Sequence, residues 1–118
     1  MSYVDGFVVP VPKKNVAAYR QLARKAGVIW KEYGAVTYME CAGDDLNPKM
    51  AATFPKALKL KKGETVFFSW IEYRNKAHRN RVNKAIMKDP RIAKMMTGKA
   101  PFDYTRMLYG GFKPIVAM

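Results

Sequence analysis

The chain has 118 residues and a formal net charge of +13, and hydrophobic residues make up 49% of it. This composition excludes a disordered tail and predicts one domain, residues 1–118, around a single core. No apolar run approaches the roughly 18 residues of a spanning helix, and the N-terminus lacks the pattern of a signal peptide. Because a lone cysteine, Cys41, forms no internal disulfide, we expect a cytoplasmic protein without a membrane partner.

In the N-terminal third, β-branched and aromatic residues predict a first strand over residues 3–9, halted by the two prolines that follow it. Residues 15–33 place apolar side chains three and four positions apart, which predicts an amphipathic helix. Gly27 inside this helix indicates a close crossing or a kink. A second strand is predicted over residues 35–42.

A long connection follows, with an extended return segment expected near residues 54–60. The third strand, residues 64–73, is apolar on both of its faces. A second helix is predicted over residues 75–88, and Pro90 opens a short extra helix. The last strand, residues 105–116, contains a glycine pair that indicates a bulge or a close backbone approach.

This order, β-α-β-β-α-β, predicts an α+β fold of the ferredoxin-like plan, an antiparallel sheet with the helices on one face and the third strand inside. Alternation divides each strand into two sets of side chains, one expected to face the helices and one to face away. The set expected to face the helices is Val4, Val8, Thr37, Met39, Cys41, Phe67, Ser69, Ile71, Met107 and Tyr109. The set expected on the open face is Tyr3, Asp5, Phe7, Val9, Val36, Tyr38, Glu40, Val66, Phe68, Trp70, Glu72, Arg106, Leu108 and Phe112.

The second set is too aromatic to be left in water on one continuous patch. Two such sheets packed face to face in a homodimer would form a closed barrel with a cavity between them. The alternative is a monomer in which the connection over residues 44–63 folds across the open face.

Five stretches, "YVDGFVVPVP", "ECAGDD", "ETVFFSWIEY", "KDPR" and "PFDYTRMLYGGF", resemble the YbaA-like family of uncharacterised bacterial proteins, which belongs to the dimeric α/β-barrel superfamily. The resemblance covers almost the whole chain and implies the fold and the dimer, but it supplies no function. The superfamily includes small monooxygenases, haem-degrading enzymes, isomerases and ligand-sensing domains that use the cavity between sheet and helices. Because fold alone does not choose among these, no reaction is assigned.

For a small-molecule site we expect Tyr38, Phe68 and Trp70 to form the apolar wall and Glu72 with Arg106 to form the polar end. Such a cavity suits a ligand-binding protein or an enzyme that needs no cofactor. The alternative for Glu72 and Arg106 is an ion pair that fixes the register of the dimer.

His78 is the only histidine, and it lies on one helical stripe with Val82 and Ile86. This spacing favours a partly buried packing role over that of a general base, although the start of a helix would suit a neutral imidazole. One histidine and one cysteine supply no metal or haem site, and no glycine-rich phosphate loop is present. We therefore expect no metal and no cofactor.

The basic residues gather on the predicted helices, which gives an alternative function, binding of nucleic acid or another polyanion. Against it, the aromatic side chains that would stack on bases are predicted on the sheet, away from this surface. A solvated basic face is the simpler interpretation.

Overall fold

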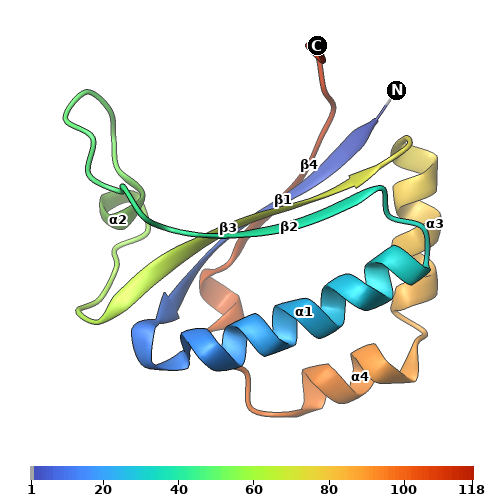
Figure 1. Cartoon of the computed structure of the whole chain (residues 1–118), viewed down its shortest axis with the longest axis horizontal. Helices are drawn as coiled ribbons and strands as arrows, with labels where there is room; N and C mark the ends of the chain where they lie inside the picture. Colours follow the sequence, from blue (N-terminus) through green and yellow to red (C-terminus); the bar gives the residue numbers. More distant parts are fainter. Residues whose placement is uncertain (1) are drawn as a thin grey trace.

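The computed structural model describes residues 2–118 and shows a four-stranded sheet with α1 (Val16–Glu32), α3 (Lys76–Ile86) and α4 (Pro90–Thr97) on one side (Figure 1). The elements are β1 (Tyr3–Pro12), η1 (Lys13–Asn15), α1 (Val16–Glu32), β2 (Thr37–Ala42), α2 (Phe54–Ala57), β3 (Glu64–Tyr73), α3 (Lys76–Ile86), α4 (Pro90–Thr97), η2 (Tyr104–Arg106) and β4 (Leu108–Phe112). Every strand pair is antiparallel and the order across the sheet is β2-β3-β1-β4. The predicted ferredoxin-like α+β plan, with the third strand inside, is confirmed.

The first strand continues through Pro10 and Pro12, where the sequence predicts its end. β4 pairs only with the stretch from Val4 to Val8, so beyond Val8 this edge of β1 has no strand partner within residues 2–118. Proline is tolerated on an edge because no ladder partner is deprived of a donor there. The prediction that the prolines halt the strand is therefore wrong.

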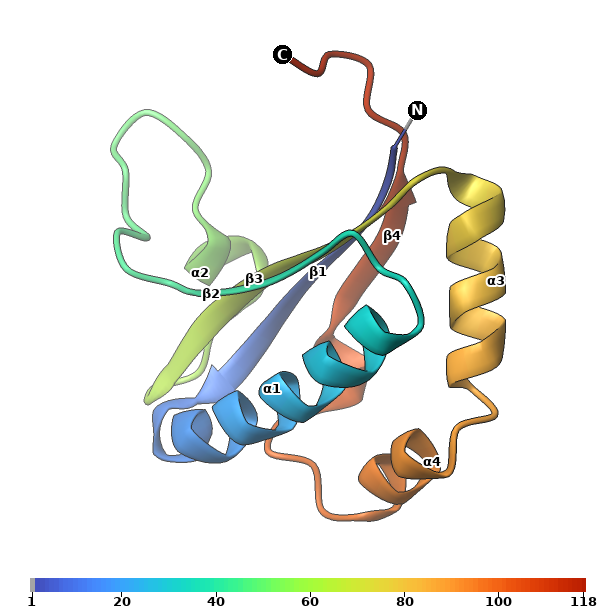
Figure 2. The same cartoon turned by 45° about the vertical axis from the view of Figure 1, so that its right-hand side comes forward.

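Two further segments differ from prediction because a side chain closes a local turn. Thr53 accepts a hydrogen bond from the Lys56 backbone amide, so the expected extended segment starts with the short helix α2. Asp103 accepts from the Thr105 amide at 2.9 Å and holds the turn η2, which delays β4. Residues 113–118 then leave the sheet on the side away from the helices (Figure 2).

Helices α3 and α4 begin where short polar side chains accept backbone hydrogen bonds. The Asn75 Oδ1 atom accepts from the His78 amide at 2.7 Å, and the Asp89 Oδ1 atom accepts from the Arg91 amide at 2.8 Å. Pro90 follows Asp89 in the first turn of α4, as predicted. No helix within residues 2–118 is long and apolar enough to cross a bilayer.

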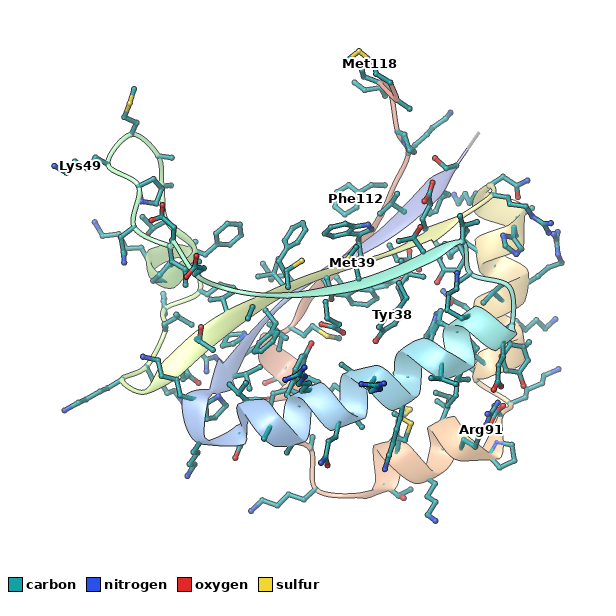
Figure 3. All side chains as sticks on the ribbon, viewed as in Figure 1. Tyr38, Met39, Lys49, Arg91, Phe112 and Met118 are labelled. Carbon is teal, nitrogen blue, oxygen red and sulfur yellow. The ribbon has the colours of Figure 1, made fainter. Side chains whose placement is uncertain are left out.

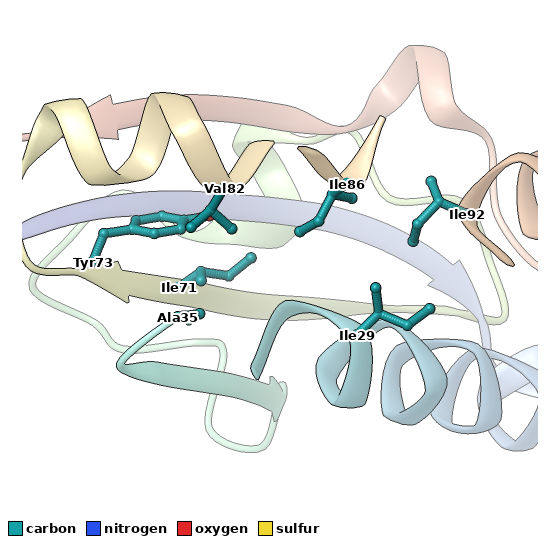
Figure 4. Close-up of a cluster of buried hydrophobic side chains, with 7 residues drawn as sticks. All are labelled: Ile29, Ala35, Ile71, Tyr73, Val82, Ile86 and Ile92. Atoms are coloured by element: carbon teal, nitrogen blue, oxygen red, sulfur yellow. The ribbon is translucent and has the colours of Figure 1, made fainter. Parts of the chain in front are cut away.

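The core lies between the sheet and the helical layer, in two clusters. One joins β3 to α1, α3 and α4 (Figure 4), and its buried members are Ile29, Ala35, Ile71, Tyr73, Val82, Ile86 and Ile92. The other joins the ends of β1 and β3 to the first turns of α1, and its buried members are Val9, Val11, Tyr19, Ala23 and Phe67.

The register shows which set of side chains in each strand faces the helices. In β1, Asp5 lies opposite Ile71 and Phe7 lies opposite Ser69, and cross-strand partners share a face. The same register brings Tyr38 of β2 opposite Ile71 and Glu40 opposite Ser69. The prediction of which side chains face the helices is therefore confirmed for β3. It is wrong for β1 and β2, whose acidic residues lie under the helices.

Candidate functional site

A cavity of about 400 Å³ lies between the inner face of the sheet and the helical layer. α1, α4 and η2 contribute apolar side chains to its walls, and all four strands contribute to its floor. Aromatic rings and methionines dominate this lining, and they include Phe7, Trp30, Tyr38, Met95, Phe102 and Tyr109. A cavity of this size and character is typical of a site for a small apolar molecule.

Glu40 is the first polar group of the cavity. The Tyr19 hydroxyl of α1 donates to its Oε1 atom at 2.8 Å, and the Tyr38 hydroxyl donates to its Oε2 atom at 3.1 Å. Burial raises the pKa of Glu40 above its ordinary value, and the hydroxyl hydrogen bonds oppose that shift. Burial, with Glu40 beside them, also raises the pKa of both tyrosines, which therefore stay neutral donors.

Tyr38 reaches this position because Gly27 of α1 has no side chain. A Cβ atom at Gly27 would lie 2.8 Å from the Tyr38 ring, closer than real contacts allow. The close crossing that the sequence indicates at Gly27 is confirmed, and it is a crossing between α1 and β2.

Asp5 is the second polar group, and it is 1% exposed. Its Oδ2 atom accepts from the side-chain amide of Asn83 at 3.4 Å, and its Oδ1 atom lies 3.4 Å from the Nε atom of Arg79. That pair is close in space but is not a hydrogen bond, so Oδ1 has no hydrogen-bond partner within residues 2–118. The Arg79 guanidinium also donates a hydrogen bond from its Nη2 atom to the Tyr3 hydroxyl, at 3.0 Å.

A hydrogen-bonded chain fixes the end of the cavity next to Asp5. The indole N–H of Trp30 donates to the Tyr73 hydroxyl at 3.1 Å, and that hydroxyl donates to the Oδ1 atom of Asn83 at 3.2 Å. Asn83 in turn holds Asp5. One chain of polar contacts therefore connects α1, β3, α3 and β1 and positions the rings around the cavity.

Of the six predicted site residues, only Tyr38 lines this cavity. Phe68, Trp70 and Glu72 alternate with the inward-facing residues of β3 and lie on the outer face of the sheet. Figure 3 shows the two sides: Tyr38 points to α1, whereas Met39 and Phe112 lie on the side away from the helices.

The expected contact between Glu72 and Arg106 is wrong. β3 and β4 are both antiparallel to β1 and so run in the same direction. Arg106, just before β4, therefore lies at the end of the sheet where β3 begins. Arg106 pairs with Glu64 there, at 2.6 Å between Nη1 and Oε2. Glu72 lies at the opposite end of β3 and accepts from the Thr37 hydroxyl at 3.0 Å.

His78 is buried at the N-terminus of α3, outside the cavity. Its Nδ1 atom accepts from the Arg74 amide at 3.1 Å, and its ring lies edge-to-face against Tyr73. Burial, aided by the positive charges of Arg74 and Arg81, lowers its pKa. These contacts agree with the packing role that the sequence favours.

The outer face of the sheet carries exposed apolar side chains. Phe68 is 45% exposed and Phe112 is 61% exposed, and Met39 and Leu108 are exposed beside them. The connection over residues 43–63 contacts β3 through α2, and these side chains remain exposed.

Sequence reasoning missed most of the cavity lining. Tyr19 and Trp30 lie on the apolar stripe of α1 and read as ordinary core, and Asn83 lies among basic residues on α3. Their common signal is a polar atom on a residue directed at the core, because such an atom requires a buried partner. Within residues 2–118, no three side chains from His, Cys, Asp and Glu converge as metal ligands.

The fold is of the ferredoxin-like α+β class, with an apolar cavity beneath its sheet. A family model described as "Protein of unknown function (DUF1428)" matches residues 2–104, and the chain belongs to this family. It is 45% identical over 116 residues to the "Uncharacterized protein YbaA" of Escherichia coli K12, with 98% of each chain covered. The resemblance that the sequence suggests is confirmed.

Two solved structures share the fold at low sequence identity. SnoaB, a cofactor-independent oxygenase from Streptomyces nogalater, has a TM-score of 0.57 at 11% identity, covering 99% of this chain and 96% of its own. A dimeric ferredoxin-like protein from an uncultured marine organism has a TM-score of 0.51 at 10% identity, covering 100% and 98%.

Proposed function

We propose that the protein binds a small, mainly apolar molecule in the cavity between its sheet and its helical layer. The observation that carries this proposal is an apolar chamber of about 400 Å³ with two carboxylates, Glu40 and Asp5, in its lining. In a core that binds no ligand, side chains that filled this space would increase stability. Buried acids in such a core would decrease it. The hydroxyl and amide partners of the two acids hold them in place, which suits recognition of polar atoms on a ligand.

We further propose that the active form is a homodimer in which the outer faces of two sheets pack together. The exposed rings of Phe68 and Phe112 support this assembly, since few monomers leave such a patch in water. The dimeric state of the marine ferredoxin-like protein supports it as well. The fold of SnoaB is compatible with chemistry in the cavity, but similarity at 11% identity carries no reaction to this chain.

The two tryptophans allow a direct test, because Trp30 lines the cavity and Trp70 lies on the outer face of the sheet. In the variant Trp70→Phe, titration with phenylethanol should change the emission of Trp30 in a saturable way. Filling the cavity with Ala26→Leu on α1 should abolish the change, whereas Ala93→Leu, at an exposed position of α4, should preserve it. Saturable binding that Ala26→Leu leaves intact would refute the proposed location.

A second candidate function is the binding of polyanions, and a groove between α1 and α4 favours it. This groove has a volume of about 820 Å³, and Lys25, Lys94 and Lys99 line it. Arg91 also lines it but pairs with Glu32 at 2.7 Å and with Asp89 at 2.9 Å.

Phosphate neutralisation by these lysines should retard oligonucleotides at low salt and fail steeply as salt rises. The double variant Lys94→Glu with Lys99→Glu should abolish the retardation. Retardation that neither salt nor this variant weakens would exclude the groove as its cause.

A further inference from the structure

The charge of the cavity is opposite to the charge of the molecule. The chain carries a formal charge of +13, yet Asp5 and Glu40 are the charged side chains of the cavity lining, and no lysine or arginine within residues 2–118 belongs to it. An anion drawn to the basic surface would therefore meet two acids inside the cavity, without a cation to bind it.

The two acids differ in how far their charge is offset. Asp5 has Arg79 as a neighbour, with 3.4 Å between the Oδ1 and Nε atoms. Among residues 2–118, no cation pairs with Glu40, and its hydrogen-bond partners at 2.8 and 3.1 Å are the neutral hydroxyls of Tyr19 and Tyr38. A buried carboxylate without a counter-charge is costly in an apolar surrounding. It is less costly when a bound cation lies against it.

The register places the two acids on opposite sides of the cavity floor. Glu40 lies across from Ser69, Ser69 lies across from Phe7, and Asp5 is two residues from Phe7 along β1. Two strand spacings and two residues of rise put the Cα atoms of Glu40 and Asp5 roughly 12 Å apart. The rings of Phe7, Trp30 and Tyr109 supply apolar lining to the same cavity.

We propose that the ligand class is an apolar, ring-bearing molecule with a protonated amine, and that the ammonium group binds the Glu40 carboxylate. This inference rests on the proposed function and names the chemistry of its ligand. A carboxylate has about four acceptor positions, so Glu40 keeps acceptor capacity beyond its two tyrosine hydrogen bonds. Asp5 supplies the second, independent observation, because its buried Oδ1 atom is an acceptor without a hydrogen bond at the far side of the same cavity.

The test compares three probes of nearly the same shape, phenylethylamine, phenylethanol and phenylacetate, by calorimetry on the full chain at neutral pH. Because a charge-assisted hydrogen bond is about twice as strong as a neutral one, the amine should bind about tenfold more tightly than the alcohol. Phenylacetate should bind most weakly. In Glu40→Gln the preference for the amine should fall to about twofold or less, while Glu72→Gln, which removes a carboxylate from the outer face of the sheet, should keep the wild-type ranking.

The outcomes separate the inference from the proposed function. If the alcohol or the acid binds the wild-type protein as tightly as the amine, the assignment of the ligand class is overturned although the cavity still binds. A preference for the amine that survives in Glu40→Gln overturns the role of Glu40. If none of the three probes binds, the proposed function fails and the inference fails with it. The ranking on the wild-type protein is decisive even if a variant does not fold.

Discussion

Replacing Phe112 by aspartate should dissociate the proposed dimer. Phe112 lies at the end of β4 on the outer face and is 61% exposed. If its full side chain presents about 200 Å², about 120 Å² remains uncovered. Covering that area on both protomers contributes up to about 6 kcal/mol at about 25 cal/mol per Å². Even half of this value corresponds to a dissociation constant raised at least about a hundredfold.

The assay is sedimentation velocity over a range of protein concentrations. The matched control is Val28→Asp, because Val28 is 53% exposed but lies on α1 in the helical layer. Wild type and control should sediment as dimers at concentrations where Phe112→Asp is monomeric. A wild-type protein that stays monomeric throughout, or a Phe112→Asp variant that associates as tightly as the control, would show that this face of the sheet does not hold two protomers together.

Three further predictions concern the cavity. Tyr73→Phe removes the buried hydroxyl that accepts from Trp30 and should lower the free energy of unfolding in urea by about 1–3 kcal/mol, since it leaves a buried donor unpaired; an unchanged value would show that the contact contributes nothing. Gly27→Ala gains about 1 kcal/mol of helix propensity but pushes into the Tyr38 ring, an overpacking cost of typically 1–3 kcal/mol, so the melting temperature should fall rather than rise. Burial raises the pKa of Glu40 above its ordinary value of 4.5. The stability linked to protonation of Glu40 is therefore full below about pH 4.5 and is lost as the pH rises through the folded-state pKa. The melting temperature of Glu40→Gln relative to wild type should increase from pH 4 to pH 7, and a constant difference would contradict the raised pKa.

Most of the fold could be predicted because the spacing of apolar residues is clearly that of a helix or of a strand in most segments. The stripe on α1, the apolar run of β3 and the proline that opens α4 each have one structural interpretation, and the structure agrees with all three. The boundaries that failed depend on contacts that no pattern displays. The end of β1 depends on how far β4 extends, and the short helix α2 depends on a single hydroxyl cap at Thr53.

The site was harder to predict because both faces of the sheet are apolar. Alternation separates two sets of residues in each strand, but it does not say which set lies under the helices. Charge suggested that Asp5 and Glu40 face away from the helices, yet both lie beneath them. There the Tyr19 hydroxyl of α1 donates a hydrogen bond to Glu40 and the Asn83 side-chain amide of α3 donates one to Asp5, and such partners are distant in sequence. Tyr38 lies two residues from Glu40 in β2 and shares its face of the sheet. The sequence therefore assigned Tyr38, like Glu40, to the wrong face.

We propose that the ligand site lies inside each protomer, beneath the sheet. The most direct measurement is a crystal structure of the wild-type protein grown with phenylethylamine. We expect density for the probe beside the Glu40 carboxylate, with its ring near Trp30. Density confined to the Trp70 side of the sheet, with Glu40 touching nothing but its two tyrosines, would contradict it.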